Sequence, residues 1–155
     1  MTQISSKSTF FYKKVFPVLW FGFLAVFIVT TLLGGAVEKD FMFLVVPCTM
    51  AVFGFFLFRK LIWNLADEVY DGGDFLVVRF RSEEENVALS NIMNVSASTN
   101  MNPPRITLRL VQPGKFGSEL AFSPTKSFTL NPFAKSEIAE DLIVRVDKAR
   151  SRRAA

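Results

Sequence analysis

The sequence has no histidine and a single cysteine, Cys48, which lies in an uncharged apolar run. A disulfide within the chain is therefore impossible, and a zinc site built from the usual Cys and His ligands cannot form. The Cys–His and Ser–His routes to nucleophilic catalysis are excluded for the same reason. Phosphate-binding glycine loops and metal-ligand clusters are also missing from the sequence. It therefore predicts a protein that is not an enzyme and that holds no cofactor or metal.

Charged residues are missing from two long stretches of the chain. The first, Val15–Val37, has 23 residues, and as a helix it would extend roughly 34 Å and cross a bilayer core. The second, Phe41–Phe58, has 18 residues and is followed by Arg59 and Lys60, which can reach the lipid headgroups. The charged connection at 38–40 is so short that the two helices must run antiparallel as neighbours. Residues 15–63 are therefore predicted to form a two-helix transmembrane hairpin.

Basic residues are distributed unequally around these two runs. Residues 1–63 hold six Lys and Arg against two Asp and Glu, whereas residues 64–155 hold twelve of each. Of the six, Lys39 alone lies in the connection, and the other five flank the outer ends of the hairpin: Lys7, Lys13, Lys14, Arg59 and Lys60. This bias predicts a multi-pass membrane protein with both termini in the cytoplasm, residues 1–14 forming a cytoplasmic N-terminal segment.

A cleaved signal peptide is the alternative interpretation of the first run, because Gly34 and Ala36 form an acceptable small-residue cleavage site. The apolar part of a signal peptide is about 7–15 residues long, however, and this run exceeds that length. Neither run contains an ionisable residue, although ion pathways through membranes usually display them. Four small residues would allow helices to pack closely, or are ordinary members of membrane helices: Gly22, Ala25, Ala51 and Gly54.

From residue 64 onward the pattern changes to short alternating runs separated by turn residues, which is typical of antiparallel sheets. Gly72 and Gly73 separate the first two predicted strands, in which Leu76, Val78 and Phe80 share one face. The clearest strand has Ile106, Leu108 and Leu110 alternating with polar residues. The predicted strands are 66–71, 75–81, 85–90, 92–98, 105–111, one that contains Leu120 and Phe122, and 126–130.

A helix is predicted at the end of the chain. Asn131 followed by Pro132 is a good helix start, a capping side chain with proline at the first helical position. Apolar residues then recur at helical spacing on one face, at Ile138, Leu142, Val146 and Ala149. Residues 64–155 are therefore expected to form a mainly-β domain of six to seven antiparallel strands closed by a C-terminal α-helix.

This order of elements resembles the bacterial pleckstrin-homology-like (PH-like) domains, in particular the family in which two transmembrane helices precede the domain. The resemblance covers nearly the whole chain, and the motifs that carry it are LADEVYD at 65–71 with its glycine turn, VALSNI at 87–92, NPPR at 102–105, and the Phe116-Gly117 turn with Phe122. It implies a half-open barrel that the C-terminal helix plugs at one end. It also implies a location in a bacterial inner membrane. Many members of this family have no assigned activity, so the resemblance implies none for this chain.

The acidic turn at 71–74 departs from the lipid-binding eukaryotic relatives, which place Lys and Arg in and around this loop to hold inositol phosphates. Asp71 and Asp74 would repel a phosphate, and a polar hairpin turn explains them better than a calcium site does. A basic surface for anionic lipid or a partner is the remaining candidate, against the plainer interpretation of solvated strand positions. Its residues would be Arg79, Arg81, Arg105, Arg109 and Lys115.

Taken together, these features favour a membrane-tethered interaction or scaffold module whose β domain binds a protein partner or itself at exposed strand edges. The alternative is a homo-oligomeric membrane channel or assembly subunit. No nucleic-acid partner is expected, because the excess positive charge lies next to the membrane runs.

Overall fold

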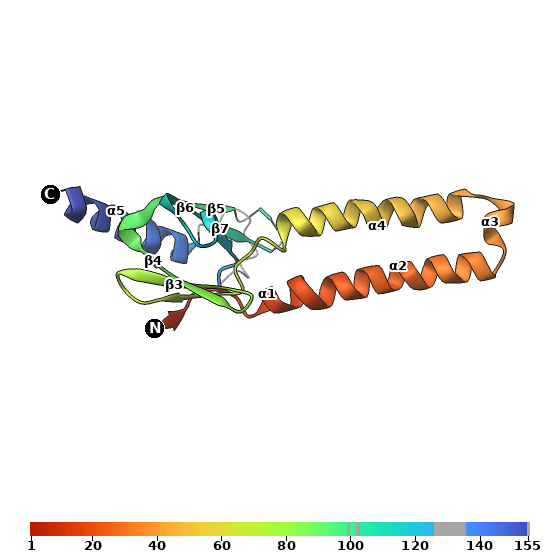
Figure 1. Ribbon diagram of the computed structural model, residues 1–155, viewed down its shortest axis with the longest axis horizontal. Helices are drawn as coiled ribbons and strands as arrows, with labels where there is room; N and C mark the ends of the chain where they lie inside the picture. Colours follow the sequence, from red (N-terminus) through yellow and green to blue (C-terminus); the bar gives the residue numbers. More distant parts are fainter. Residues whose placement is uncertain (99, 102, 126–135, 155) are drawn as a thin grey trace. The chain divides into compact units, whose positions relative to one another are not determined.

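The computed structural model describes residues 1–98, 100–101, 103–125 and 136–154. The chain folds as two compact units (Figure 1). One unit is a helical hairpin, Phe10–Asn64, and the other combines Met1–Thr9 with Leu65–Ala155. Residues on both sides of the hairpin in the sequence therefore build a single β domain.

The first arm of the hairpin is one continuous helical stretch from Ser8 to Leu33, made of α1 (Ser8–Phe10), a π-helical turn η1 (Phe11–Val15) and α2 (Phe16–Leu33). The π turn comes directly before Pro17, whose ring cannot donate a hydrogen bond and clashes with the carbonyl four residues earlier in a regular helix. Widening the turn relieves that clash, and the Phe16 N–H donates to the Phe11 carbonyl instead.

The second arm is α4 (Met42–Leu61), which follows the short helix α3 (Ala36–Lys39). Gly35 has φ of 66°, a left-handed conformation that glycine adopts without strain, and it starts the reversal between the arms. Both arms are long and apolar enough to cross a membrane, with mean hydropathies of 2.3 and 2.0 in their most apolar windows.

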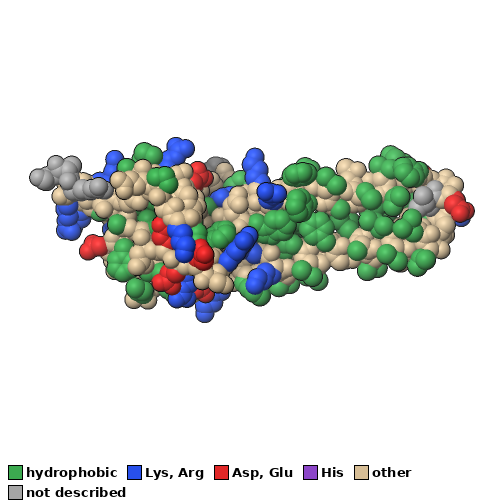
Figure 2. Space-filling model, in the orientation of Figure 1, with side chains coloured by type: hydrophobic (Ala, Val, Ile, Leu, Met, Phe, Trp, Pro, Cys, Tyr) green, Lys and Arg blue, Asp and Glu red, His purple; other side chains and the backbone are tan. Residues whose placement is uncertain are grey.

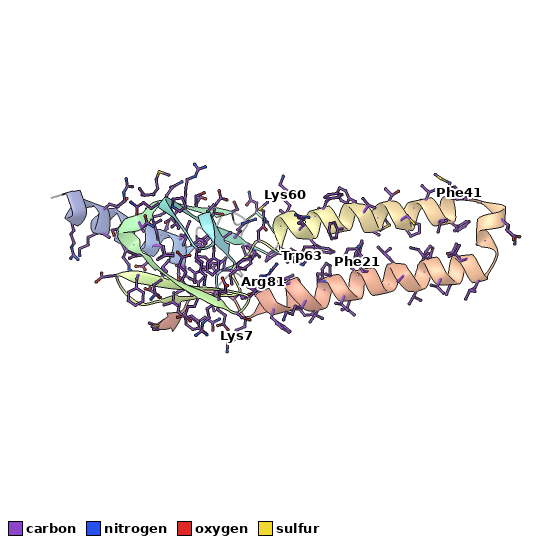
Figure 3. The ribbon with its side chains drawn as sticks, viewed as in Figure 1. Lys7, Phe21, Phe41, Lys60, Trp63 and Arg81 are labelled. Carbon is purple, nitrogen blue, oxygen red and sulfur yellow. The ribbon has the colours of Figure 1, made fainter. Side chains whose placement is uncertain are left out.

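The hairpin is held together largely by aromatic rings. Phe58 is buried and lies edge-on to Phe16 and Phe21, with ring centroids 5.7 and 5.8 Å apart. Only 17% of the most apolar 18-residue stretch of each arm is buried. Large apolar side chains cover the outside of both arms (Figures 2 and 3). A core helix of a soluble protein would bury most of its apolar surface, so these two helices lack the burial typical of that class.

The β domain contains two antiparallel sheets (Figure 1). The four-stranded sheet has the order β1-β2-β3-β4, and the three-stranded sheet has the order β5-β6-β7. A 3₁₀ turn, η2 (Leu89–Asn91), connects β4 to β5. The strands are β1 (Thr2–Gln3), β2 (Glu68–Asp71), β3 (Phe75–Phe80), β4 (Glu83–Ala88), β5 (Ile92–Ser98), β6 (Arg105–Gly114) and β7 (Gly117–Phe122).

The N-terminal segment joins the two sheets along one side. Gln3 pairs with Tyr70 of β2, and the buried Ser5 forms a bridge to Pro124, just after β7. The Ser5 hydroxyl accepts the Val69 N–H at 2.8 Å, and the Val69 carbonyl accepts the Ile4 N–H at 2.9 Å. Strand β1 has no counterpart among the predicted strands.

The core lies between the two sheets and α5 (Glu137–Ala154). Alternation of apolar and polar residues explains it, because every second residue of a strand points to the same face. Helix α5 packs against η2 and β5, and the Ser136 hydroxyl caps it by accepting the Ala139 N–H at 3.4 Å. Residues with less than 2% exposure in this core include Leu76, Val78, Ile92, Ile106, Leu108, Phe122 and Leu142.

Most predicted elements of the β domain are confirmed, including the alternation in β6, the buried Leu108 and the buried face of the C-terminal helix. Strand β4 begins two residues earlier than expected, because Arg81 and Ser82 form a tight turn in which Arg81 has φ of 61°. Val77 lies on the face of β3 opposite Leu76 and Val78 and is also buried, with Tyr70 and Asn86 as its register partners. The predicted strand 126–130 and the helix start at Asn131 and Pro132 lie outside the described residues.

Candidate functional site

Strand β4 forms one end of the four-stranded sheet and leaves one of its own edges open. Phe80 and Glu83 close the two-residue turn to β3, and the register continues to the pair Phe75 and Ala88. In this register the N–H and C=O groups of alternate residues, Glu84, Asn86 and Ala88, point away from β3. All three side chains are exposed. Within the part of the chain that the structure describes, no strand pairs with β4 on this side.

The inward side of β4 is occupied by the turn between β6 and β7. The Glu85 carboxylate accepts the backbone N–H groups of Lys115 and Phe116 at 2.9 and 3.3 Å, and the Lys115 ammonium pairs with Glu83 at 3.3 Å. A Cβ at Gly114 would lie only 2.1 Å from Glu85 Oε1, so any other residue there would move this carboxylate from its present position. These contacts hold β4 to the turn between β6 and β7.

Strand β5, an edge strand of the three-stranded sheet, is partly covered. Helix α5 packs against it, and the Arg150 guanidinium donates to the Met93 carbonyl at 3.2 Å. The start of β5 is therefore occupied by the domain's own helix, so β4 is more open than β5.

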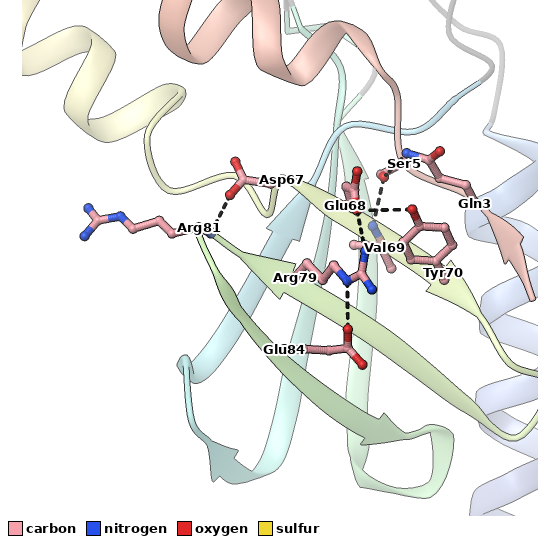
Figure 4. A network of polar contacts seen from close by, with 9 residues as sticks. All are labelled: Gln3, Ser5, Asp67, Glu68, Val69, Tyr70, Arg79, Arg81 and Glu84. Carbon is pink, nitrogen blue, oxygen red and sulfur yellow. Dashed lines mark hydrogen bonds and ion pairs between the residues drawn. The ribbon is translucent and has the colours of Figure 1, made fainter.

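A polar network lies on the outer face beside β4 (Figure 4). Arg79 donates to Glu84 at 2.7 Å and to Glu68 at 3.1 Å, and these two hydrogen bonds raise the pKa of its guanidinium. The Tyr70 hydroxyl donates to Glu68 at 3.1 Å, which raises the pKa of Tyr70. The Arg79 guanidinium also lies 5.4 Å from the centre of the Tyr70 ring. Arg79 is thus already bound to acidic partners within the sheet.

The five basic residues of the predicted surface are spread over both sheets. Arg79 and Lys115 are paired with glutamates, and Arg81 is an exposed turn residue whose backbone N–H donates to Asp67 at 2.5 Å. Arg105 and Arg109 lie on β6 of the other sheet, Arg109 exposed and Arg105 half-buried with its Nε atom unpartnered among the described residues. The structure therefore brings Arg79 and Arg81 together in one hairpin but does not gather all five into one patch.

Asp71 of the acidic turn is tied to the C-terminal helix. Its carboxylate binds the Arg145 guanidinium through two contacts of 2.5 and 2.7 Å and accepts the Gly73 N–H at 2.9 Å. The hydrogen bonds from Arg145 are the main cause that lowers the pKa of Asp71. Arg145 also donates to the Gly73 carbonyl and to Asp141. This carboxylate therefore acts as an anchor for α5. Among the described residues, no group of three or more Cys, Asp or Glu side chains is placed so that it could hold a metal ion.

The four small residues of the hairpin lie in different environments. Gly54 is buried, and a Cβ added to it would lie 2.9 Å from Nε1 of Trp20 on the opposite arm. Ala51 is half-buried, whereas Gly22 and Ala25 are exposed on α2. Gly54 therefore lets the two arms approach each other, and Gly22 and Ala25 point away from that contact.

Sequence reasoning missed the N-terminal strand and the anchor between Asp71 and Arg145. Both depend on partners far away in the sequence, and a two-residue strand carries no detectable alternation. Comparison of the chain with protein-family models, with curated proteins and with solved structures finds no match in any of the three.

Proposed function

We propose that the chain is a membrane-tethered interaction module of the PH-like kind. In this account the hairpin anchors the protein in a bacterial inner membrane, and the β domain on the cytoplasmic side binds a protein, either a partner or another copy. The open outer edge of β4 is the single observation that carries the proposal.

Membrane anchoring is supported by the exposed apolar surface of both arms of the hairpin. Water would have to solvate rings such as Phe23 and Phe53, which are 67% and 68% exposed, and lipid removes that cost. Strand β1 precedes the hairpin and pairs with β2, which follows it, so both flanks of the hairpin must lie on the same side of the membrane. This supports a chain that crosses the membrane an even number of times. Cleavage after Ala36 would remove β1 from the sheet, which disfavours the signal-peptide alternative. The bias of basic residues favours the cytoplasmic side.

Protein binding at β4 follows from the chemistry of an open strand edge. Unpaired N–H and C=O groups at regular spacing are a template on which another strand can add. Tethering to a membrane raises the effective concentration of such domains, so that weak edge contacts suffice. Recognition of anionic lipid by the β domain is disfavoured, because the twelve basic residues of 64–155 are balanced by twelve acidic ones. Arg79 and Lys115 are moreover already paired with glutamates.

Photo-crosslinking in intact membranes tests the proposal. A photoreactive residue at Asn86, which is exposed on β4, should give a crosslinked protein adduct. The matched control is Arg109, which is also exposed but lies in the centre of the other sheet, and it should give none.

A second variant tests whether the edge itself is used. Asn86→Pro removes an outward N–H without touching the pairing of β4 with β3, and proline is tolerated on an edge strand in this orientation. It should abolish adducts from a photoreactive residue at the neighbouring Ala88. Equal adducts from positions 86 and 109, or adducts that persist in Asn86→Pro, would contradict binding through this edge.

A further inference from the structure

A set of basic side chains gathers at one end of the helical hairpin. Lys14 lies two residues before Phe16, and Arg59 and Lys60 directly follow Phe58. The Phe16 and Phe58 rings are in contact with centroids 5.7 Å apart, so the start of α2 and the end of α4 meet here. All three basic residues are exposed. We call Lys14, Arg59 and Lys60 the basic end of the hairpin.

No acidic residue balances this charge within the hairpin unit. The acids of residues 10–64 are Glu38 and Asp40, and both lie in the connection at the opposite end. Lys39 is the single basic residue there, so that end carries a net charge of −1. Figure 3 shows Lys60 and Trp63 at one end of the hairpin and Phe41 at the other. The two ends of the hairpin therefore differ in sign as well as in position.

Aromatic residues at the basic end favour a lipid surface as its partner. Trp63 packs against Phe55 with ring centroids 5.5 Å apart, and the Lys14 ammonium lies 5.1 Å from the centre of the Phe10 ring. Tryptophan is enriched at the level of lipid headgroups, where its ring is apolar and its N–H can bind polar groups. At that level the cations beside it face phosphates.

We propose that the basic end binds the headgroups of anionic phospholipids, with cations from both arms of the hairpin contributing. The planar guanidinium of Arg59 can bind two phosphate oxygens at once, and the ammonium groups of Lys14 and Lys60 add charge at the same end of the hairpin. The site rests on the membrane anchoring proposed above. It is separate from the basic residues of the β domain and requires nothing of them.

Native mass spectrometry of the full-length protein in detergent tests this site. The probes are phosphatidylglycerol and phosphatidylcholine with identical acyl chains. The wild-type protein should retain phosphatidylglycerol over phosphatidylcholine by on the order of tenfold or more, because each of the three cations contributes about 1 kcal/mol near anionic headgroups. The combined variant Lys14→Gln, Arg59→Gln, Lys60→Gln should lose most of that preference.

Two controls keep the test specific. Lys39→Gln removes one positive charge at the opposite end and should leave the preference unchanged. The double variant Lys14→Arg, Lys60→Arg keeps the charge and should retain the preference. If substitution merely disturbed the hairpin, the double Arg variant would lose lipid retention as the triple Gln variant does. Equal retention of the two lipids by the wild type, or an unchanged preference in the triple Gln variant, would overturn the proposed site.

Alkaline carbonate extraction of membranes separates this result from the anchoring proposal. Release of the wild-type protein by carbonate would contradict membrane anchoring itself. Retention in the carbonate pellet together with no preference for phosphatidylglycerol would refute the lipid site alone.

Discussion

Ser5→Ala removes one hydrogen-bond acceptor from the seam between the N-terminal segment and β2. The Ser5 side chain is fully buried, and its hydroxyl accepts the Val69 N–H at 2.8 Å. Alanine fills nearly the same space but leaves that N–H buried without a partner, which costs about 1–3 kcal/mol. Since about 1.4 kcal/mol corresponds to a factor of ten, the protection of this amide should fall by roughly 5- to 150-fold.

Hydrogen exchange of the full-length protein in detergent measures this loss at the Val69 amide. Amides in β6 should keep most of their protection, because their partners lie in β5 and β7. Ser82→Ala, at an exposed position in the turn between β3 and β4, is the matched control. It should change neither the protection of the Val69 amide nor that of the β6 amides. Unchanged protection of Val69 in Ser5→Ala would show that the Ser5 hydroxyl does not accept this N–H.

Three further predictions concern the core, the anchor of α5 and the hairpin. Leu108→Asp should abolish the cooperative thermal transition of the β domain, because an unpaired charge in a fully buried site costs several kcal/mol. Asp71 has a lowered pKa when folded, so its pairing with Arg145 stabilises the domain above the pKa of the unfolded group and is lost as the pH falls through the folded pKa. Asp71→Asn should therefore lower the melting temperature at pH 7 and flatten its dependence on acidic pH, and an unchanged profile would contradict the anchor. Gly54→Val should lower the melting temperature of the hairpin in detergent by displacing the indole packed on it, whereas the exposed Gly22→Val should leave it unchanged.

Elements whose evidence is local could be predicted from the sequence. In β6 the alternation of Ile106, Leu108 and Leu110 with polar residues identifies both the strand and its buried face, and the structure buries all three. The same holds for Leu142 and Val146 in α5 and for the two glycines that separate β2 from β3. These patterns arise within one segment, so no knowledge of distant partners is needed.

Features that depend on distant partners could not be predicted. Ser5 and Val69 are separated by 64 positions, and Asp71 and Arg145 by 74, with nothing in either segment to indicate the other. Asp71 therefore looked like an ordinary turn residue. Similarly, exposed strand edges were expected in general, but the choice of β4 depends on the order of strands and on the cover that α5 gives to β5.

The central claim is a hairpin that crosses the membrane twice and returns both of its flanks to one β domain. Single cysteines at Gln3, Lys39 and Ser82 in a Cys48→Ser background, labelled with a membrane-impermeant thiol reagent in vesicles of known orientation, test it most directly. Gln3 and Ser82 should label from the cytoplasmic side, with Gln3 the slower of the two because it is half-buried in the sheet, and Lys39 should label only from the opposite side. Labelling of Lys39 from the same side as Ser82, or of Gln3 and Ser82 from opposite sides, would contradict the account.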